Sequence, residues 1–364
     1  MLFEDLATEL VIQILLFCSS VDDVLALSTT CRRFHNILHC SQRLAILEHA
    51  AEAQYGPLLD LTQLLTHNDS QPAHIIRTVP FSLALLKQMV HAGRIADKWC
   101  AIYPFKKWKH NYESRRLLTD DEHYRLRAAI YRTWLYSRAF HNAQHPRESR
   151  VTRPMIQKRA ALLHNWTTPS LADIADFAAV LRDVVQNNIC PSNGTIARRF
   201  KKRHPSNDQS LLFNIHLNYP PPAPAPAPHN PFTNQSPANL WSRFTTPYAA
   251  PARYACPAAK LASHDVGAEG WGDDISHYYV IEDYVKLDPE QVLWLREHAP
   301  LKGMVEGHVR LLGSWFENNG ATLGQTIDWV LDERGESAGG FAEAIAEGRL
   351  GVALAGDREG RDAR

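Results

Sequence analysis

The chain has 364 residues, with 39 basic and 39 acidic side chains and therefore a formal net charge of zero. This balance argues against a protein that is held on nucleic acid or on a membrane surface by its overall charge. The length is sufficient for two or three folding units, and the six cysteines include no Cys-x-x-Cys pair, which indicates free thiols in a reducing compartment.

The strongest helical pattern lies between residues 3 and 38. Ser20 and Asp23 have the spacing of a helix N-cap and its third position, which predicts a second short helix after a first one. A third apolar turn follows around Phe34. Helices this short bury too little surface to be stable alone, so we expect the rest of the chain or another protein to cover their apolar faces. The apolar residues of the first helix recur at helical spacing: Leu6, Leu10, Ile14 and Phe17.

This segment resembles an F-box, the module that recruits the Skp-family adaptor of SCF (cullin–RING) ubiquitin ligases. The family usually has proline after the first leucine, whereas this chain has Ala7, which does not fix the backbone angle φ as proline does. The alternative is an ordinary helical hairpin that packs on its own domain. The resemblance is carried by Leu6-x-x-Glu9-Leu10, Ile14-Leu15, Asp23-Val24-Leu25-x-Leu27 and Cys31-Arg32-Arg33-Phe34.

The resemblance implies an adaptor-binding surface on these helices and a role as a non-catalytic substrate receptor of an SCF ubiquitin ligase. The implied partners are the Skp-type adaptor, through it a cullin, and a target protein that the sequence does not identify. No cofactor and no metal are expected. The implied apolar anchors are Leu6, Leu10, Ile14, Leu15, Leu25, Leu27 and Phe34, with Ala7 and Cys31 in the same motif and Glu9 and Arg33 at the polar rim.

The remaining chain is predicted to be helical in most places. A capping box at 119–122 opens a long helix through His141, and Ser170 with Asp173 opens another. Residues 288–291 have the pattern of a helix start, and a last helix begins at Thr322 and ends at Gly335. The best candidate for a strand is 277–286, although its residues also suit a helix.

Seven prolines between 219 and 231 block helices and sheet ladders and predict an extended linker. The tail is rich in Gly, Ala and charge, which predicts disorder. The predicted fold is therefore mainly α, with the following organisation. It comprises a three-helix F-box over 1–44, an irregular helical body over 45–203, a largely disordered proline-rich linker over 204–270, a smaller helical region over 271–335 and a disordered tail over 336–364.

Charge is distributed unevenly: residues 87–159 carry 17 Lys/Arg against 6 Asp/Glu, a local net charge of +11 by subtraction. Aromatic residues are interleaved with these cations, so the alternative function is nucleic-acid or chromatin binding. The other interpretation places Trp99, Phe105, Trp108 and Trp134 in the core, with the cations in water. A second basic cluster fits a nuclear-import signal and equally a solvated helix end: Arg198, Arg199, Lys201, Lys202 and Arg203.

Two short motifs resemble catalytic or metal-binding sites, but the residues that such sites also need are missing from the sequence around them. Residues 335–339 match G-x-S-x-G around Ser337, but no histidine follows to serve as a base. His141 and His145 have zinc-site spacing, yet no third ligand is evident. No run is apolar enough to span a bilayer, and the N-terminus lacks the features of a signal peptide, so the sequence predicts a cytoplasmic or nuclear protein without a membrane partner.

Overall fold

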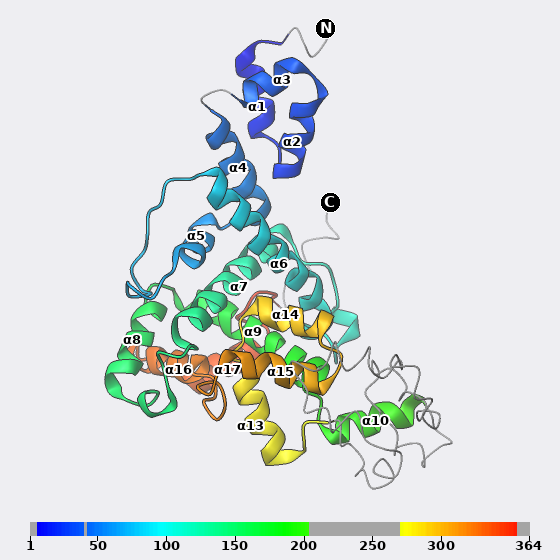
Figure 1. The fold of residues 1–364 in the computed structure, drawn as a ribbon, viewed down its shortest axis with the longest axis vertical. Helices are drawn as coiled ribbons and strands as arrows, with labels where there is room; N and C mark the ends of the chain where they lie inside the picture. The colour runs from blue at the N-terminus through cyan, green and yellow to red at the C-terminus, as the bar shows by residue number, and fades with distance from the viewer. Residues whose placement is uncertain (1–5, 40–41, 204–269, 355–364) are drawn as a thin grey trace, which may run out of the picture. The chain divides into compact units, whose positions relative to one another are not determined.

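The computed structural model describes residues 6–39, 42–203 and 270–354. The chain forms two compact units. The first unit is discontinuous in sequence and consists of three segments, Met1–Ala139, Gln157–Ala178 and Gly324–Arg364. The second unit combines Phe140–Ile156 with Ala179–Leu323. The described residues are mainly helical and contain no strand, which confirms the predicted fold class (Figure 1).

Helices of the first unit come from three separate parts of the sequence. The predicted order of one F-box, one body and one C-terminal region therefore differs from the observed units, because residues from 324 onward belong with the N-terminal part. Helix α9 contributes residues to both units. The helices are α1 (Thr8–Leu16), α2 (Val21–Thr30), α3 (Arg32–Leu38), α4 (Arg43–Tyr55), α5 (Leu58–Thr66), α6 (Leu83–Lys107), α7 (Asp120–Phe140), α8 (Arg153–Leu163), α9 (Thr168–Val184), α16 (Leu323–Glu333) and α17 (Ala338–Ala346).

Large aromatic side chains fill the core of the first unit. Trp99 of α6 is fully buried, and its ring meets Phe177 of α9 edge to face with 5.2 Å between centroids. Helices α4 and α6 approach closely because Gly93 has no side chain: a Cβ there would overlap the ring of Tyr55. The backbone carbonyl of Tyr55 accepts a hydrogen bond from the Tyr131 hydroxyl at 2.8 Å, which ties α4 to α7.

The second unit has its own aromatic core. The Tyr284 ring lies 5.2 Å from Trp271 and 5.7 Å from Phe316, measured between centroids, and all three side chains are buried. Residues 277–286, the strand candidate, lie mostly in helix α13, in agreement with the mainly α prediction. The helices of this unit are α10 (Asn193–Arg203), α13 (Asp274–Tyr284), α14 (Pro289–His298) and α15 (Lys302–Leu312).

Two helices start where the sequence predicts, and both begin with a capping box, which was predicted only for 119–122. Before α7, Glu122 N–H donates to Thr119 Oγ1 at 3.3 Å, and Thr119 N–H donates to the Glu122 carboxylate at 2.8 Å. Before α14, Asp288 and Gln291 make the same reciprocal pair, and Pro289 is the first helical residue. These reciprocal bonds satisfy backbone donors that the first turn of each helix leaves unpaired.

Two boundaries differ from the prediction, and a third predicted segment lies almost wholly outside the described residues. Helix α9 begins earlier, since Thr167 rather than Ser170 is the cap: Ser170 N–H donates to Thr167 Oγ1 at 3.4 Å. The prediction of a disordered tail over 336–364 is wrong for 336–354, which contain α17 and the buried Val352. The predicted linker over 204–270 lies outside the described residues, apart from Gly270.

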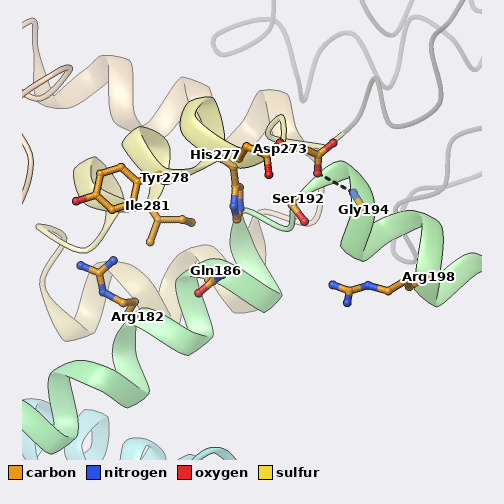
Figure 2. A pocket seen from close by; sticks show the side chains of 10 residues that line it. Arg182, Gln186, Ser192, Gly194, Arg198, Asp273, His277, Tyr278 and Ile281 are labelled. Carbon is orange, nitrogen blue, oxygen red and sulfur yellow. Dashed lines mark hydrogen bonds between the residues drawn. The ribbon is translucent and has the colours of Figure 1, made fainter.

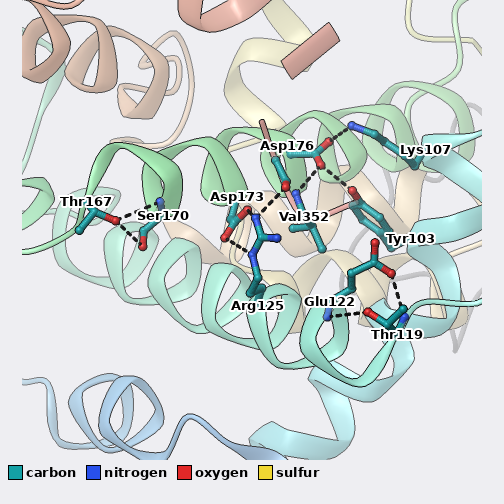
Figure 3. A network of polar contacts seen from close by, with 11 residues as sticks. Tyr103, Lys107, Thr119, Glu122, Arg125, Thr167, Ser170, Asp173, Asp176 and Val352 are labelled. Atoms are coloured by element: carbon teal, nitrogen blue, oxygen red, sulfur yellow. Dashed lines mark hydrogen bonds and ion pairs between the residues drawn. The ribbon is translucent and has the colours of Figure 1, made fainter. Parts of the chain in front are cut away.

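Hydrogen bonds hold the segment after α17 against α9 (Figure 3). The Asp176 carboxylate accepts the Val352 N–H at 3.1 Å, the Tyr103 hydroxyl at 2.5 Å and the Lys107 ammonium at 2.6 Å. The Gly351 carbonyl accepts from Arg125 at 2.8 Å. Gly351 has φ +101°, and a Cβ at this position would lie 2.7 Å from the Asp176 carboxylate.

We therefore expect Gly351→Ala to lower the free energy of unfolding by about 1–3 kcal/mol, because alanine is strained at this φ and collides with Asp176. Gly324→Ala is the matched control, since no atom lies within 4 Å of its added Cβ. In α16 this control is expected to be neutral or to stabilise by about 0.5–1 kcal/mol. Urea denaturation of both variants checks the difference, and equal stability would contradict the proposed collision.

Candidate protein-binding surface

Helices α1, α2 and α3 pack on α4, which contacts all three (Figure 1). The side chain of Gln54 in α4 accepts the N–H of Val21 at 2.9 Å, which fixes the start of α2 against α4. The chain itself thus covers one side of the three short helices. The sequence predicts that either the rest of the chain or another protein covers their apolar faces, and α4 provides the first kind of cover. No described residue covers the parts of these helices that are exposed beside α4.

Helix α1 has two apolar faces. Val11 and Leu15 point inward and are 0% and 1% exposed. Leu10, Ile14 and Phe17 are spaced i, i+4 and i+7 and share the other face. On this second face, Leu10 is 53% exposed and Phe17 is 84% exposed. A short helix with apolar residues on both sides and only one side packed is typical of a protein-binding element.

Local capping fixes α2 and α3. The Ser20 hydroxyl accepts the N–H of Asp23 at 3.0 Å, which confirms the predicted N-cap. Cys31 caps α3, because its sulfur accepts the N–H of Phe34 at 3.5 Å. The Arg33 guanidinium donates to the backbone carbonyl of Leu6, linking α3 to the entry of α1. Cys31 and Arg33 therefore have structural contacts within the chain.

The implied anchor residues fall into a buried and an exposed group. Leu15 (1% exposed) and Phe34 (6% exposed) are covered by the chain's own helices and belong to the core in this arrangement. The surface open to a partner is therefore smaller than the resemblance implies, and Phe17, which was not included among the anchors, is its most exposed member. Leu10, Leu25, Ala7 and Glu9 are exposed, and Leu6, Ile14 and Leu27 are partly exposed.

Ala7 occupies the N-cap position of α1 with φ −57° and ψ 145°. Proline would fix φ near −65°, so alanine already adopts the backbone conformation that the family's proline imposes. The backbone at Ala7 is thus compatible with the proline of the F-box pattern that this segment resembles.

At least five of the 17 cations in the basic region over 87–159 form ion pairs. Two of these pairs are visible in Figure 3, where Lys107 and Arg125 meet carboxylates of α9. Such pairs reduce the number of cations that can contact phosphates, which weighs against nucleic-acid binding by this region. The pairs are Lys107–Asp176 (2.6 Å), Arg116–Glu122 (2.5 Å), Arg125–Asp173 (2.7 Å), Arg127–Asp97 (3.2 Å) and Arg132–Asp60 (2.8 Å).

The aromatic residues of this region divide between core and surface. Trp99 and Trp134 are buried, at 0% and 1% exposed, as one interpretation predicts. The placement of Phe105 in the core is wrong, because this ring is 62% exposed near the end of α6. Tyr112 is 71% exposed, and Trp108 is partly buried. The sequence pattern identifies the aromatic residues of this region, but it does not distinguish the exposed rings from the buried ones.

The predicted import cluster begins on helix α10. Arg198 is exposed, while the Arg199 guanidinium donates to the backbone carbonyl of Asn187 at 2.8 Å. Lys201, Lys202 and Arg203 lie in α10, and their side chains are outside the described part of the structure. Nuclear import through this cluster stays a prediction.

A concavity of about 420 Å³ lies in the second unit between α10, α13 and the end of α9 (Figure 2). Its polar groups are largely engaged within the chain. Asp273 accepts the N–H of Gly194 at 2.9 Å, and Arg182 forms an ion pair with Glu282 at 2.7 Å. His277 Nε2 lies 2.8 Å from the Cys190 carbonyl. Because these polar groups already have partners within the chain, the lining of the concavity does not indicate a particular ligand.

The two chemical patterns found in the sequence have local roles here. The Ser337 hydroxyl accepts the N–H of Gly340 at 3.2 Å and caps α17, and no strand leads into it. His141 Nε2 lies 3.2 Å from the Thr322 hydroxyl. Among the described residues, no group of three or more His, Cys, Asp or Glu side chains is placed to hold a metal ion. Within the same ranges, no helix combines the length and apolar character that crossing a bilayer requires.

In comparisons with protein-family models, with curated proteins and with solved structures, the chain has no match. A functional assignment therefore rests on the residues and contacts of the chain itself. The exposed apolar face of α1 is the feature with the most specific implication.

Proposed function

We propose that the chain is an F-box substrate receptor, which binds a Skp-type adaptor through α1–α3 and holds a target protein near an SCF ubiquitin ligase. The proposal rests on the resemblance of residues 3–38 and on one structural observation. That observation is the unpacked face of α1, where Leu10 and Phe17 are 53% and 84% exposed while the opposite face is fully buried. Burial of exposed aliphatic and aromatic side chains drives helix–groove recognition between proteins.

In this proposal the protein performs no bond-making chemistry. The rate of ubiquitin transfer would rise because the receptor keeps the target close to the charged conjugating enzyme. The adaptor would contact Leu10, Ile14 and Phe17 on α1 and Leu25 on α2, while Leu15 and Phe34 hold the helices together from inside. A cytoplasmic or nuclear location belongs to the same proposal.

Nucleic-acid binding is the alternative from a different class. It is disfavoured because carboxylates of the same unit pair with Lys107, Arg116, Arg125, Arg127 and Arg132. A nucleic-acid complex would show a steep loss of affinity with rising salt, since each phosphate contact releases counterions. Adaptor binding through an apolar face is expected to depend only weakly on salt.

The test is co-purification of the intact chain with a recombinant Skp-type adaptor. Leu10→Asp with Phe17→Asp is expected to weaken the complex by at least about 700-fold, because each change places a charge in an apolar interface worth about 2 kcal/mol or more per anchor. Thermal unfolding should be nearly unchanged, since both side chains are already in water.

Leu59→Asp is the matched control, because Leu59 is a 61% exposed leucine on α5, outside α1–α3. It should leave adaptor binding within about twofold of the original protein. The proposal is wrong if the unmodified chain does not associate with the adaptor, or if the control weakens the complex as much as the α1 variant does.

A further inference from the structure

A second concave site lies in the first unit and has a volume of about 700 Å³. It is formed by the C-terminal part of α6, the connection between α6 and α7, and the first turns of α7. Its wall is largely apolar and includes Ala101, Pro104, Phe105, Leu117 and Leu118. A volume of this size admits one or more large protein side chains.

The rim of this pocket exposes apolar groups around a positioned cation. Phe105 and Leu117 are 62% and 84% exposed. The guanidinium carbon of Arg115 lies 5.1 Å from the centre of the Phe105 ring and 4.8 Å from that of Tyr112. Two aromatic faces within this distance attract a guanidinium and restrict where it can lie. Arg115 is thus held at the mouth of an apolar pocket.

Arg115 differs from the other arginines of the pocket in pairing with no carboxylate whose side chain the structure describes. Arg116 pairs with Glu122, and Arg127 pairs with Asp97. Among the side chains that the structure describes, none forms an ion pair or hydrogen bond with Arg115. A guanidinium that no carboxylate neutralises can pair with a ligand carboxylate through its terminal nitrogens.

The other titratable groups do not compete for this role. Burial raises the pKa of Cys100 to about 12, so the thiol is neutral and unreactive at pH 7. Burial, together with the nearby Arg127 charge, lowers the pKa of His123, so this ring adds no positive charge at neutral pH. Within the described side chains, the pocket therefore presents apolar surface and the guanidinium of Arg115, which no carboxylate neutralises.

We propose that this pocket binds an acidic peptide segment of another protein: a large apolar side chain enters between Pro104, Phe105 and Leu118, and an adjacent carboxylate pairs with Arg115. A peptide is favoured over nucleic acid because Arg116 and Arg127 of this pocket are paired with carboxylates, whereas a nucleic-acid backbone is held by several free cations. That the bound segment belongs to a ubiquitylation target rests on the proposed function, while peptide binding itself does not.

The experiment uses the full chain and an array of fluorescein-labelled peptides, in which one central position is varied and flanked by two Glu or Asp on each side. Peptides with central Leu or Phe are expected to bind, and those with central Ser or with Gln/Asn flanks should bind at least about tenfold more weakly. Arg115→Glu and Leu117→Ser should each reduce binding of the Phe peptide by at least about tenfold.

Lys87→Glu and Leu83→Ser are the matched controls, because both residues are exposed at the other end of the same helix α6. They should leave peptide binding within about twofold. Leu10→Asp should also retain it, so failure of adaptor binding and failure of this site give different results. The proposal is overturned if no acidic peptide binds, if Arg115→Glu binds equally well, or if labelled oligothymidylate binds more tightly than every peptide in an Arg115-dependent way.

Discussion

Asp176→Ala is expected to lower the free energy of unfolding by about 2–5 kcal/mol, the largest change predicted for this chain, because two buried donors lose their acceptor at about 1–3 kcal/mol each. The Asp176 side chain is 3% exposed and accepts hydrogen bonds from Tyr103, Lys107 and Val352. Removing the carboxylate leaves the Tyr103 hydroxyl buried without an acceptor, because Tyr103 itself is 0% exposed. Lys107 is 18% exposed and can turn toward water, so the hydroxyl and the Val352 N–H carry most of the loss.

The measurement is urea denaturation combined with hydrogen exchange. Exchange should accelerate at Gly351 and Val352 in the variant, because their segment loses its anchor on α9. Asp328→Ala is the control: this exposed carboxylate on α16 should change stability by less than about 0.5 kcal/mol. Unchanged exchange at residues 351–352 in Asp176→Ala would show that other contacts hold the segment.

Lys286→Met is expected to stabilise the chain at pH 7 by about 1–3 kcal/mol. The Lys286 side chain is 1% exposed, and burial lowers its pKa to about 8 even though Asp283 lies 3.4 Å away. Its ammonium lies 4.1 Å from the centre of the Phe316 ring and donates to the Phe316 carbonyl. Methionine removes the cost of burying the charge and keeps most of the volume, while the Phe316 carbonyl loses a donor.

Asp283 does not become an unpaired buried charge in this variant. Its carboxylate also accepts the N–H groups of Asn318 at 2.7 Å and Asn319 at 2.9 Å. These two hydrogen bonds remain when Lys286 is replaced, so Asp283 keeps hydrogen-bond donors after it loses the ammonium group. The change in the free energy of unfolding is therefore set mainly by the removal of the Lys286 charge.

The dependence of stability on pH distinguishes this explanation from simple better packing. The pKa of Lys286 is about 8 in the folded chain and about 10.5 in the unfolded chain, so the unfolded state binds more protons between these values. The original protein should therefore gain stability as pH rises from 8 toward 10.5, and the advantage of Lys286→Met should shrink over the same range. An advantage independent of pH would assign the effect to packing.

The quantity to measure is the difference in stability between the original protein and Lys286→Met. Burial raises the pKa of Tyr284, so this tyrosine lowers the stability of both proteins at alkaline pH and partly hides the gain from Lys286.

Local signals made several elements predictable. Ser20 before α2 and Asp288 before α14 cap their helices as expected, because a cap depends on atoms three residues apart. The apolar spacing of α1 likewise predicts a helix. It does not predict which side is buried, since Leu10 and Leu15 are the same residue type and only contact with other helices separates them.

Long-range contacts explain the errors. The segment around Gly351 is glycine-rich and was predicted to be disordered, yet it is ordered by Asp176, about 175 residues earlier in the chain. Phe105 has helical spacing typical of the core, but lies in the last turn of α6, where it is 62% exposed. Neither fact is encoded in a short window of sequence, so both required the three-dimensional structure.

The discontinuity of the first unit has a consequence for biosynthesis. Ribosomes deliver the chain from its N-terminus, and domains usually fold as they emerge. Here α6 and α9 are synthesised long before Val352, so Asp176 can pair with Tyr103 and Lys107 early, whereas its third donor, the Val352 N–H, is synthesised 176 residues later. Nascent chains that stop before residue 324 would lack α16, α17 and this donor, and would expose apolar surface to chaperones. Arrested ribosome–nascent chain complexes of increasing length should therefore become protease-resistant in the first unit only after residues 351–353 have left the exit tunnel.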